Sequence, residues 1–364
     1  MERRICNNCH SQLQVPPKAT TIRCKCQALY TVGSSSSPRV DHNGSTAQKQ
    51  VPNSSMKLLR SRNINNDNIS IETSPWLGFS ANLLNSTRRQ PRKALLIGVS
   101  YQDQKYQLNG TINDTKNMWN LLTYQLRFPK DAICVLTDDN LSLSPTKENM
   151  QRALKWLVQD CQFGDSLVFY FSGHGLRQHD FNNDEIDGYD ETLCPVDFKT
   201  AGMIFDNDIN DVIVKPLKPG VKLHAIVDAC HSGTILDLEH VYSRDKRLWI
   251  DNKSPSRANK SPIGGVAISL SACADNKMAV DTTAFSRNAT DGALTYIFTK
   301  IMKEKGGKVT YAELLNEMQK MIESVNDSLC LKSSLIKRLF RNKIVQEPQI
   351  SASQVIDING YLNL

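Results

Sequence analysis

The sequence predicts an α/β fold, a three-layer sandwich in which helices cover both faces of a mostly parallel central sheet. The first observation is a set of short apolar runs typical of buried parallel strands, at 94–99, 166–171, 223–227 and 266–270. The second is a set of amphipathic segments that alternate with these runs or come after them, near 113–126, 146–161, 292–304 and 310–323. Because ligands of such sheets bind beyond the carboxyl ends of the strands, we expect functional residues there.

Length and composition favour one large domain with a smaller appendage. The chain has 364 residues, 40% of them hydrophobic, which suffices for a substantial core. No apolar stretch approaches the roughly 20 residues that cross a bilayer, and the first residues do not resemble a secretory signal. We therefore expect an intracellular protein, cytoplasmic or nuclear, whose ten cysteines serve as thiols, metal ligands or a nucleophile rather than as disulfides.

Three segments of different composition succeed one another along the chain. Residues 1–32 hold four closely spaced cysteines, and residues 33–91 are rich in Ser, Asn and Gln, which predicts a disordered linker. Residues 92–364 carry the apolar runs, and a Lys-, Arg-, Ser- and Pro-rich stretch at about 241–262 predicts an exposed loop. Residues 1–93 contain 14 Lys and Arg against 4 Asp and Glu, so the net positive charge belongs to the N-terminal part.

Two of the predicted strands end in sequences suited to nucleophilic catalysis. Residues 172–175 (Ser-Gly-His-Gly) follow one strand and residues 228–233 (Asp-Ala-Cys-His-Ser-Gly) follow the other. A cysteine nucleophile needs a base to form its thiolate, and glycines let a substrate backbone approach closely. We predict Cys230 as the nucleophile, His174 as the general acid and base, and the N–H groups of Gly175 and Cys230 as the oxyanion hole.

Two neighbours of Cys230 bear on this assignment. His231 is adjacent to the nucleophile, but successive residues near a strand end point apart, which ranks it below His174 as the base. Asp228 lies two residues before Cys230, so on an extended strand both side chains face the same side. A carboxylate beside the nucleophile predicts a substrate with a basic side chain.

Residues 92–364 resemble the peptidase domain of type I metacaspases, a family of caspase-like cysteine peptidases. The matching motifs occur in the family's order at 93–98, 172–175, 187–191, 228–233 and 348–352. The resemblance implies a caspase-like fold, a Cys-His dyad, cleavage of proteins after Arg or Lys, calcium stimulation, self-processing of a zymogen, and a role in programmed cell death or stress signalling. We expect self-cleavage in the 241–262 loop, which contains Arg244, Lys246, Arg247, Lys253, Arg257 and Lys260.

Further site residues are implied by this resemblance. It implies that Asp114 adds a second carboxylate to the substrate pocket and that Ser172 lines it, although by position alone Asp114 would serve equally well as a helix N-cap. It also implies a calcium site formed by Asp190, Asp206, Asn207 and Asp237. Asn207 stands where the family usually has aspartate, which removes one charge. The acidic stretch 180–191 lacks the glycine at the sixth place of an EF-hand, so we predict no EF-hand, and in isolation it would be a solvated loop.

The N-terminal segment predicts a structural zinc site. Four cysteines supply thiolates for one tetrahedral ion: Cys6, Cys9, Cys24 and Cys26. The segment resembles the lesion-simulating-disease type of zinc finger that precedes the peptidase domain in some plant metacaspases. The last pair is C-x-C rather than that family's C-x2-C, which leaves His10 as a substitute ligand and a disordered cysteine-bearing tail as the alternative.

The sequence is compatible with three functions. The first is an Arg/Lys-directed peptidase, and the second is a catalytically weak caspase-like scaffold that acts through protein interactions of the zinc finger. The intact pair of Cys230 and His174 favours the first. The third, a nucleic-acid binder, is disfavoured because the finger lacks a recognition helix and basic residues with interleaved aromatics.

Overall fold

The computed structural model describes residues 89–139, 143–272, 291–331 and 347–364, with Leu84 and five short strands elsewhere, at 2–5, 12–15, 21–23, 29–31 and 281–282. The chain divides into two compact units, Met1–Glu72 and Thr73–Leu364. In the first unit two antiparallel strand pairs form, β1 (Glu2–Ile5) with β2 (Gln12–Val15) and β3 (Thr21–Arg23) with β4 (Leu29–Thr31). The predicted zinc ligands and most of the predicted linker lie outside the described residues.

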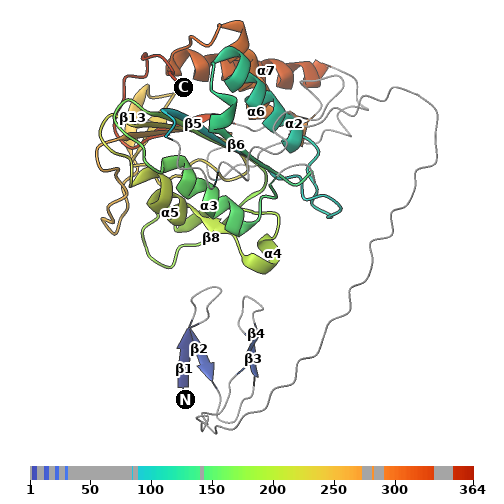
Figure 1. The fold of residues 1–364 in the computed structure, drawn as a ribbon, viewed down its shortest axis with the longest axis vertical. Coiled ribbons are helices and arrows are strands. Elements are labelled where there is room, and N and C mark those ends of the chain that lie inside the picture. Colours follow the sequence, from blue (N-terminus) through green and yellow to red (C-terminus); the bar gives the residue numbers. More distant parts are fainter. Residues whose placement is uncertain are drawn as a thin grey trace, which may run out of the picture. The chain divides into compact units, whose positions relative to one another are not determined.

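An eight-stranded sheet forms the centre of the second unit, in the order β13-β12-β17-β14-β11-β7-β5-β6 (Figure 1). Its strands are β5 (Arg92–Gly98), β6 (Ile133–Thr137), β7 (Ser166–Ser172), β11 (Lys222–Asp228), β12 (His240–Ser243), β13 (Leu248–Asp251), β14 (Val266–Ser271) and β17 (Gln349–Ala352). The strands from β14 to β6 are parallel, whereas β17, β12 and β13 extend the sheet in antiparallel pairs. All four predicted strands form, and they lie side by side as β14, β11, β7 and β5.

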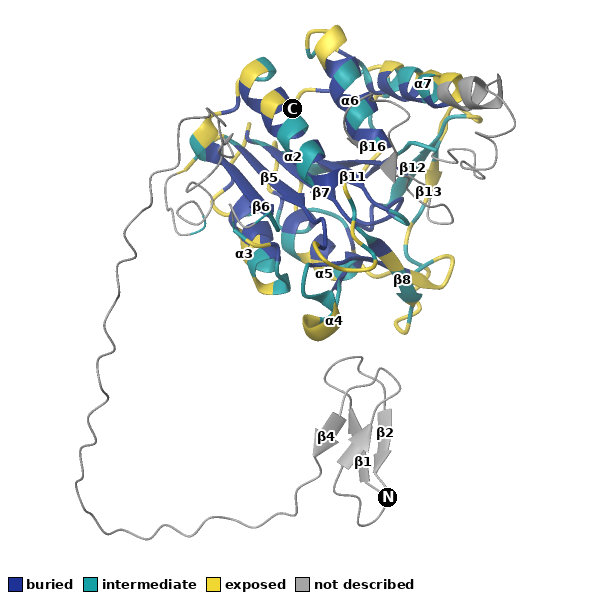
Figure 2. Cartoon of the chain, turned by 90° about the vertical axis from the view of Figure 1, so that its right-hand side faces the viewer, coloured by how far each residue is buried: buried dark blue, intermediate teal, exposed yellow. Residues whose placement is uncertain are grey.

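Helices cover both faces of this sheet, which confirms the expected three-layer α/β sandwich (Figures 1 and 2). The helices are α2 (Thr111–Asn120), α3 (Lys147–Val158), α4 (Phe198–Ala201), α5 (Asp206–Ile209), α6 (Ala293–Glu304) and α7 (Tyr311–Leu331). Alternation along β5 shows why two layers form: Ala94 and Leu96 join the core beneath α2, α6 and α7, while Leu95 and Ile97 join the core beneath α3 and α5. The strand is therefore apolar throughout, as a strand buried on both faces must be.

Short turns and small sheets complete the unit. π-Helical turns continue α2 and α5 at Leu121–Gln125 and Asn210–Val214, and a 3-10 turn occupies Lys130–Ala132. A three-stranded antiparallel sheet contains β8 (Gly175–His179), β9 (Tyr189–Leu193) and β10 (Ile204–Phe205), and β15 (Asp281–Thr282) pairs with β16 (Asp291–Gly292). Within the described part of the chain, no helix has the length and apolar character needed to cross a membrane.

The 241–262 segment differs from the exposed loop that the sequence predicts. Its first half forms a hairpin of β12 and β13 at the edge of the central sheet. Lys246, Arg247, Lys253 and Arg257 are exposed, but Lys260 is only 6% exposed. Composition could not distinguish this lysine from its neighbours, because its burial depends on acidic residues distant in sequence.

Candidate active site

Strand register brings the predicted dyad to one place. β7 and β11 are parallel neighbours in which Ser172 lies opposite Asp228. His174 and Cys230 each come two residues later, so they leave adjacent strand ends at the same level. Both residues are partly exposed, and the Gly173 N–H donates to the Asp228 carbonyl at 3.4 Å. The carboxyl edge of the sheet therefore holds a histidine and a cysteine side by side, as the sequence predicts.

Gly175 packs against the main chain of Cys230. A Cβ atom at this position would lie 2.1 Å from the Cys230 carbonyl oxygen and 3.4 Å from the Ala229 Cβ. No side chain fits in that space, so only glycine lets β8 start so close to Cys230. The two residues predicted to form the oxyanion hole are thus in direct backbone contact.

A main-chain carbonyl sets the orientation of the His174 ring. The His174 Nε2 atom lies 2.7 Å from the Tyr106 carbonyl oxygen, which can only accept a hydrogen bond. Nε2 must therefore carry the proton, which leaves Nδ1 with a lone pair for a thiol proton. The ring also packs against Tyr101, with ring centroids 4.8 Å apart. The main-chain N–H of His174 donates a hydrogen bond to the Tyr101 hydroxyl at 3.0 Å.

Sequence reasoning missed both tyrosines. Tyr101 and Tyr106 lie just beyond the carboxyl end of β5, the strand next to β7. Their position directly after the apolar run at 94–99 was the signal that could have found them. Burial raises the pKa of Tyr101 well above its usual range, which keeps its hydroxyl protonated. That hydroxyl donates to the Cys194 carbonyl at 2.7 Å and so fixes the ring beside His174.

Solvent access separates Cys230 from the other described thiols. Cys134, Cys161 and Cys194 are buried, which is usual for free cysteines that pack as small hydrophobic residues, whereas Cys230 is partly exposed. Burial, together with the nearby Cys230, raises the pKa of Cys194 to about 12. The Cys194 thiol thus stays protonated, and among the thiols that the structure describes Cys230 is the accessible one.

The N-terminus of α6 holds the two predicted substrate carboxylates. Asp114 accepts the Gly292 N–H at 2.9 and 3.0 Å and the Ser172 hydroxyl at 3.2 Å. Asp228 accepts both the N–H and the hydroxyl of Thr295 at 2.8 Å. The structure therefore brings the predicted pocket residues together. The N-cap alternative for Asp114 does not hold, because α2 has Gly110 as its N-cap.

Two residues at the start of α6 complete this arrangement, and sequence reasoning missed them. A Cβ atom on Gly292 would lie 2.4 Å from Asp228 Oδ2 and 2.7 Å from Asp114 Oδ2, so the carboxylates approach each other across this glycine. The Thr295 hydroxyl also lies 2.8 Å from the buried hydroxyl of Tyr170. Thr295 thus links Asp228 to the core of the sheet.

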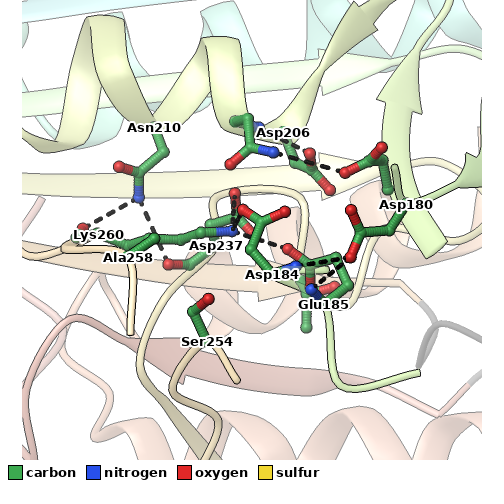
Figure 3. A network of polar contacts seen from close by, with 12 residues as sticks. Asp180, Asp184, Glu185, Asp206, Asn210, Asp237, Ser254, Ala258 and Lys260 are labelled. Atoms are coloured by element: carbon green, nitrogen blue, oxygen red, sulfur yellow. Dashed lines mark hydrogen bonds and ion pairs between the residues drawn. The ribbon is translucent and has the colours of Figure 1, made fainter. Parts of the chain in front are cut away.

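The predicted calcium ligands belong to an acidic cluster: Asp190 lies on β9, Asp206 and Asn207 lie on α5, and Asp237 lies just before β12. Figure 3 shows Asp206 and Asp237 with their acidic neighbours. Asp206 accepts the N–H groups of Glu191 and Asn207 at 2.6 and 2.7 Å, and the Asn207 amide lies 3.5 Å from Asp190 Oδ1. Two triads of carboxylates have ligand atoms within 4.8 Å of one another: Asp180, Asp184 and Asp190, and Glu185, Asp190 and Asp206. Sequence reasoning missed Asp180, Asp184 and Glu185, although all three lie in the acidic stretch it singled out.

Burial raises the pKa values of four carboxyl groups in this cluster, those of Glu185, Asp190, Asp206 and Asp237. The pKa of Asp190 rises to about 7 through burial and the charges of neighbouring carboxylates, and that of Glu185 to about 8 through burial and Asp237. Burial also raises the pKa values of Asp206 and Asp237. A cation stabilises the ionised form of buried carboxyl groups that repel one another. Oxygen-rich sites suit a hard cation such as Ca²⁺.

Comparison with known proteins identifies the family of this chain. Residues 92–239 match the family described as metacaspase, peptidase C14 domain. The chain is 38% identical to Metacaspase-1 of Arabidopsis thaliana over 97% of this chain and 94% of the relative, and 42% identical to Metacaspase-3 of the same plant over 73% and 74%. The crystal structure of the Drosophila initiator caspase Dronc aligns over 75% of this chain and 82% of its own, with 10% identity and a TM-score of 0.38. On the similarity to Metacaspase-1 along nearly the whole length, this chain belongs to the metacaspases, a family of cysteine peptidases.

Proposed function

We propose that this peptidase cleaves protein chains after arginine or lysine. The observation that supports it is the pair of buried carboxylates at the strand end that carries Cys230, with Asp114 0% and Asp228 6% exposed. Two buried carboxylates side by side repel each other and attract a positive charge. A guanidinium or ammonium group of the substrate would supply that charge and bring its carbonyl carbon to the nucleophile.

Cys230 and His174 then divide the chemistry. The Cys230 thiol gives its proton to Nδ1 of His174, and the thiolate attacks the carbonyl carbon of the scissile bond. The N–H groups of Gly175 and Cys230 stabilise the oxyanion. Nδ1–H then protonates the leaving amine, and a water molecule, deprotonated by the same nitrogen, hydrolyses the thioester.

Kinetics on short peptide amides test the specificity. Asp228→Ala should reduce kcat/KM after Arg by one to two decades, since a charge-assisted hydrogen bond contributes about 1.5–3 kcal/mol, and Asp228→Glu should lose less. Substrates ending in Asp should not be cleaved. Cys230→Ala is the control and should abolish all hydrolysis, while His174→Ala should lower it by orders of magnitude. Efficient cleavage after Asp, or Arg cleavage that survives removal of both carboxylates, would place the pocket elsewhere.

Calcium stimulation and self-processing form the second part of the proposal. The acidic cluster fits a calcium ion because its donors are carboxylate and amide oxygens, several of them with raised pKa values. Asp190, Asp206, Asn207 and Asp237 would hold the ion, and its charge would neutralise their repulsion. Exposed basic residues of the 241–262 segment are the expected self-cleavage positions: Lys246, Arg247, Lys253 and Arg257. Sequencing the products formed with calcium and with a chelator tests this, and chelator-insensitive activity would remove calcium from the scheme.

The remaining parts of the proposal rest on family membership and the sequence. They are a structural zinc ion on the N-terminal cysteines, a protein partner for that finger, a cytoplasmic or nuclear site of action, and a role in programmed cell death or stress signalling. Metal analysis of protein purified without chelator tests the first. About one equivalent of zinc is expected, lost when Cys6 and Cys9 are replaced by serine.

A further inference from the structure

Lys260 is a positive charge built into the acidic cluster. Its side chain is 7% exposed, and its Nζ atom lies 2.9 Å from Asp184, 2.8 Å from Glu185 and 2.9 Å from Asp237 (Figure 3). The contact with Glu185 is a hydrogen bond, whereas those with Asp184 and Asp237 are ion pairs. Lys260 is therefore paired with three carboxylates that belong to, or adjoin, the proposed calcium ligands.

One ammonium group does not satisfy the cluster. No salt bridge within the described part of the chain reaches Asp180, Asp190 or Asp206, although their ligand atoms belong to the two carboxylate triads. Asp184 is 7% exposed, and among the described residues its second oxygen, Oδ1, has no hydrogen-bond partner. A buried carboxylate oxygen without a donor is unfavourable unless a cation meets it. The cluster therefore has negative charge and a free ligand atom left for a divalent ion.

Lys260 also fastens its own segment to the cluster. Asn252, Ser254 and Ala258 line a hollow that they share with Asp184, Glu185 and Asp237. The Lys260 carbonyl accepts the Asn210 side-chain amide at 3.1 Å, but residues 255–259 before it are exposed. The ammonium contacts thus hold the end of a segment that otherwise has few buried side chains.

We propose that Lys260 is the resident cation of this site and that a divalent ion binds by exchanging with its ammonium group. Calcium takes oxygens at about 2.3–2.6 Å and needs six or more of them, so it requires oxygens that Lys260 now occupies. The two positive charges cannot share the same oxygens without strong repulsion. The lysine therefore leaves when the ion enters, and residues 252–260 lose the contact that holds them. This inference rests on the proposed calcium site and gives the ion a second effect, exposure of the segment to cleavage.

Calcium binding by the full-length Cys230→Ala protein, which cannot cut itself, tests the exchange. Titration calorimetry gives the affinity, and hydrogen exchange measured by mass spectrometry monitors residues 252–260. Lys260→Met keeps the length of the side chain but removes the charge, and should bind calcium at least about tenfold more tightly, because no ammonium group has to be displaced. Lys260→Arg should bind no more tightly than wild type. Lys253→Met is the matched control, since Lys253 is exposed and pairs only weakly with Asp251, at 3.5 Å.

The protein with Lys260 intact provides a second readout if the methionine variant fails to fold. Calcium should speed hydrogen exchange of the backbone amides in residues 252–260 by at least about tenfold. Magnesium should not, because it retains several of its bound water molecules. Two results would refute the displacement of Lys260 but leave calcium control standing. One is calcium affinity in Lys260→Met equal to that of the protein with Lys260, and the other is calcium binding without faster hydrogen exchange in residues 252–260. Binding by Lys260→Met alone supports the exchange but refutes calcium control of the natural protein. No binding by either overturns both, while the peptidase assignment is unaffected.

Discussion

Gly292→Ala offers the sharpest test of the proposed substrate pocket. The backbone at this residue, φ −65° and ψ 132°, is open to alanine, so the substitution costs no backbone strain. The added methyl group would lie 2.4 Å from Asp228 Oδ2 and 2.7 Å from Asp114 Oδ2, closer than real contacts allow. The carboxylates must therefore move away from the N–H groups of Gly292 and Thr295 that hold them at 2.8–3.0 Å.

The expected loss can be worked out from those hydrogen bonds. A hydrogen bond to a charged group contributes about 1.5–3 kcal/mol, and about 1.4 kcal/mol is tenfold in rate, so losing one should lower kcat/KM after Arg by roughly 10- to 150-fold. The assay compares kcat/KM for peptide amides ending in Arg and in Ala, and the Arg preference should shrink by the same factor.

A matched glycine separates this effect from a general loss of stability. Gly164→Ala places a side chain at φ +88° with no atom within 4 Å, so it should cost about 1 kcal/mol of stability and leave the Arg preference unchanged. If Gly292→Ala retained wild-type Arg cleavage within about twofold, the carboxylates would not be the determinants of specificity.

Three further outcomes are expected. Thr295→Val should lower kcat/KM after Arg about tenfold through loss of the hydroxyl bond to Asp228, Thr295→Ser should restore it, and Tyr170→Phe should reduce stability without changing specificity. Burial lowers the pKa of His224 to about 3, so between pH 7 and 5 the unfolded chain takes up a proton that the folded chain does not. Urea unfolding should show that the wild type loses about 2 kcal/mol more than His224→Gln over this range. Asn207→Asp adds a ligand charge near Asp190 and should tighten calcium binding about tenfold in calorimetry, and an unchanged affinity would remove residue 207 from the site.

The placement of His174 beside Cys230 was predictable because both residues follow strand ends. The apolar runs before His174 and Cys230 identified two strands, and parallel neighbours in register bring the residues just beyond their carboxyl ends to the same edge of the sheet. The pocket was only partly predictable. Asp114 and Gly292 are 178 residues apart, and their contact depends on how α6 packs against α2.

Other features leave no trace in residue type. The acceptor for His174 is a main-chain carbonyl, which any residue at position 106 could offer. Lys260 lies in a segment whose composition predicts exposure, and only the three-dimensional structure brings three carboxylates around it. Hydrophobic periodicity predicts strands and helices, but it does not indicate which distant charges will meet.

The order of strands in the sheet determines what a cut in the 252–262 region would produce. β11 and β12 precede the cut, whereas β14 and β17 come after it, and β11 pairs with β14 while β12 pairs with β17. Each fragment thus supplies strands that pair with strands of the other, so hydrogen bonds of the central sheet hold the two fragments together. Cleavage should yield a two-chain particle that comigrates with the intact protein in gel filtration and separates only in denaturant. For the same reason, the two fragments expressed as separate chains should reassemble, because each contains the strands with which the other pairs.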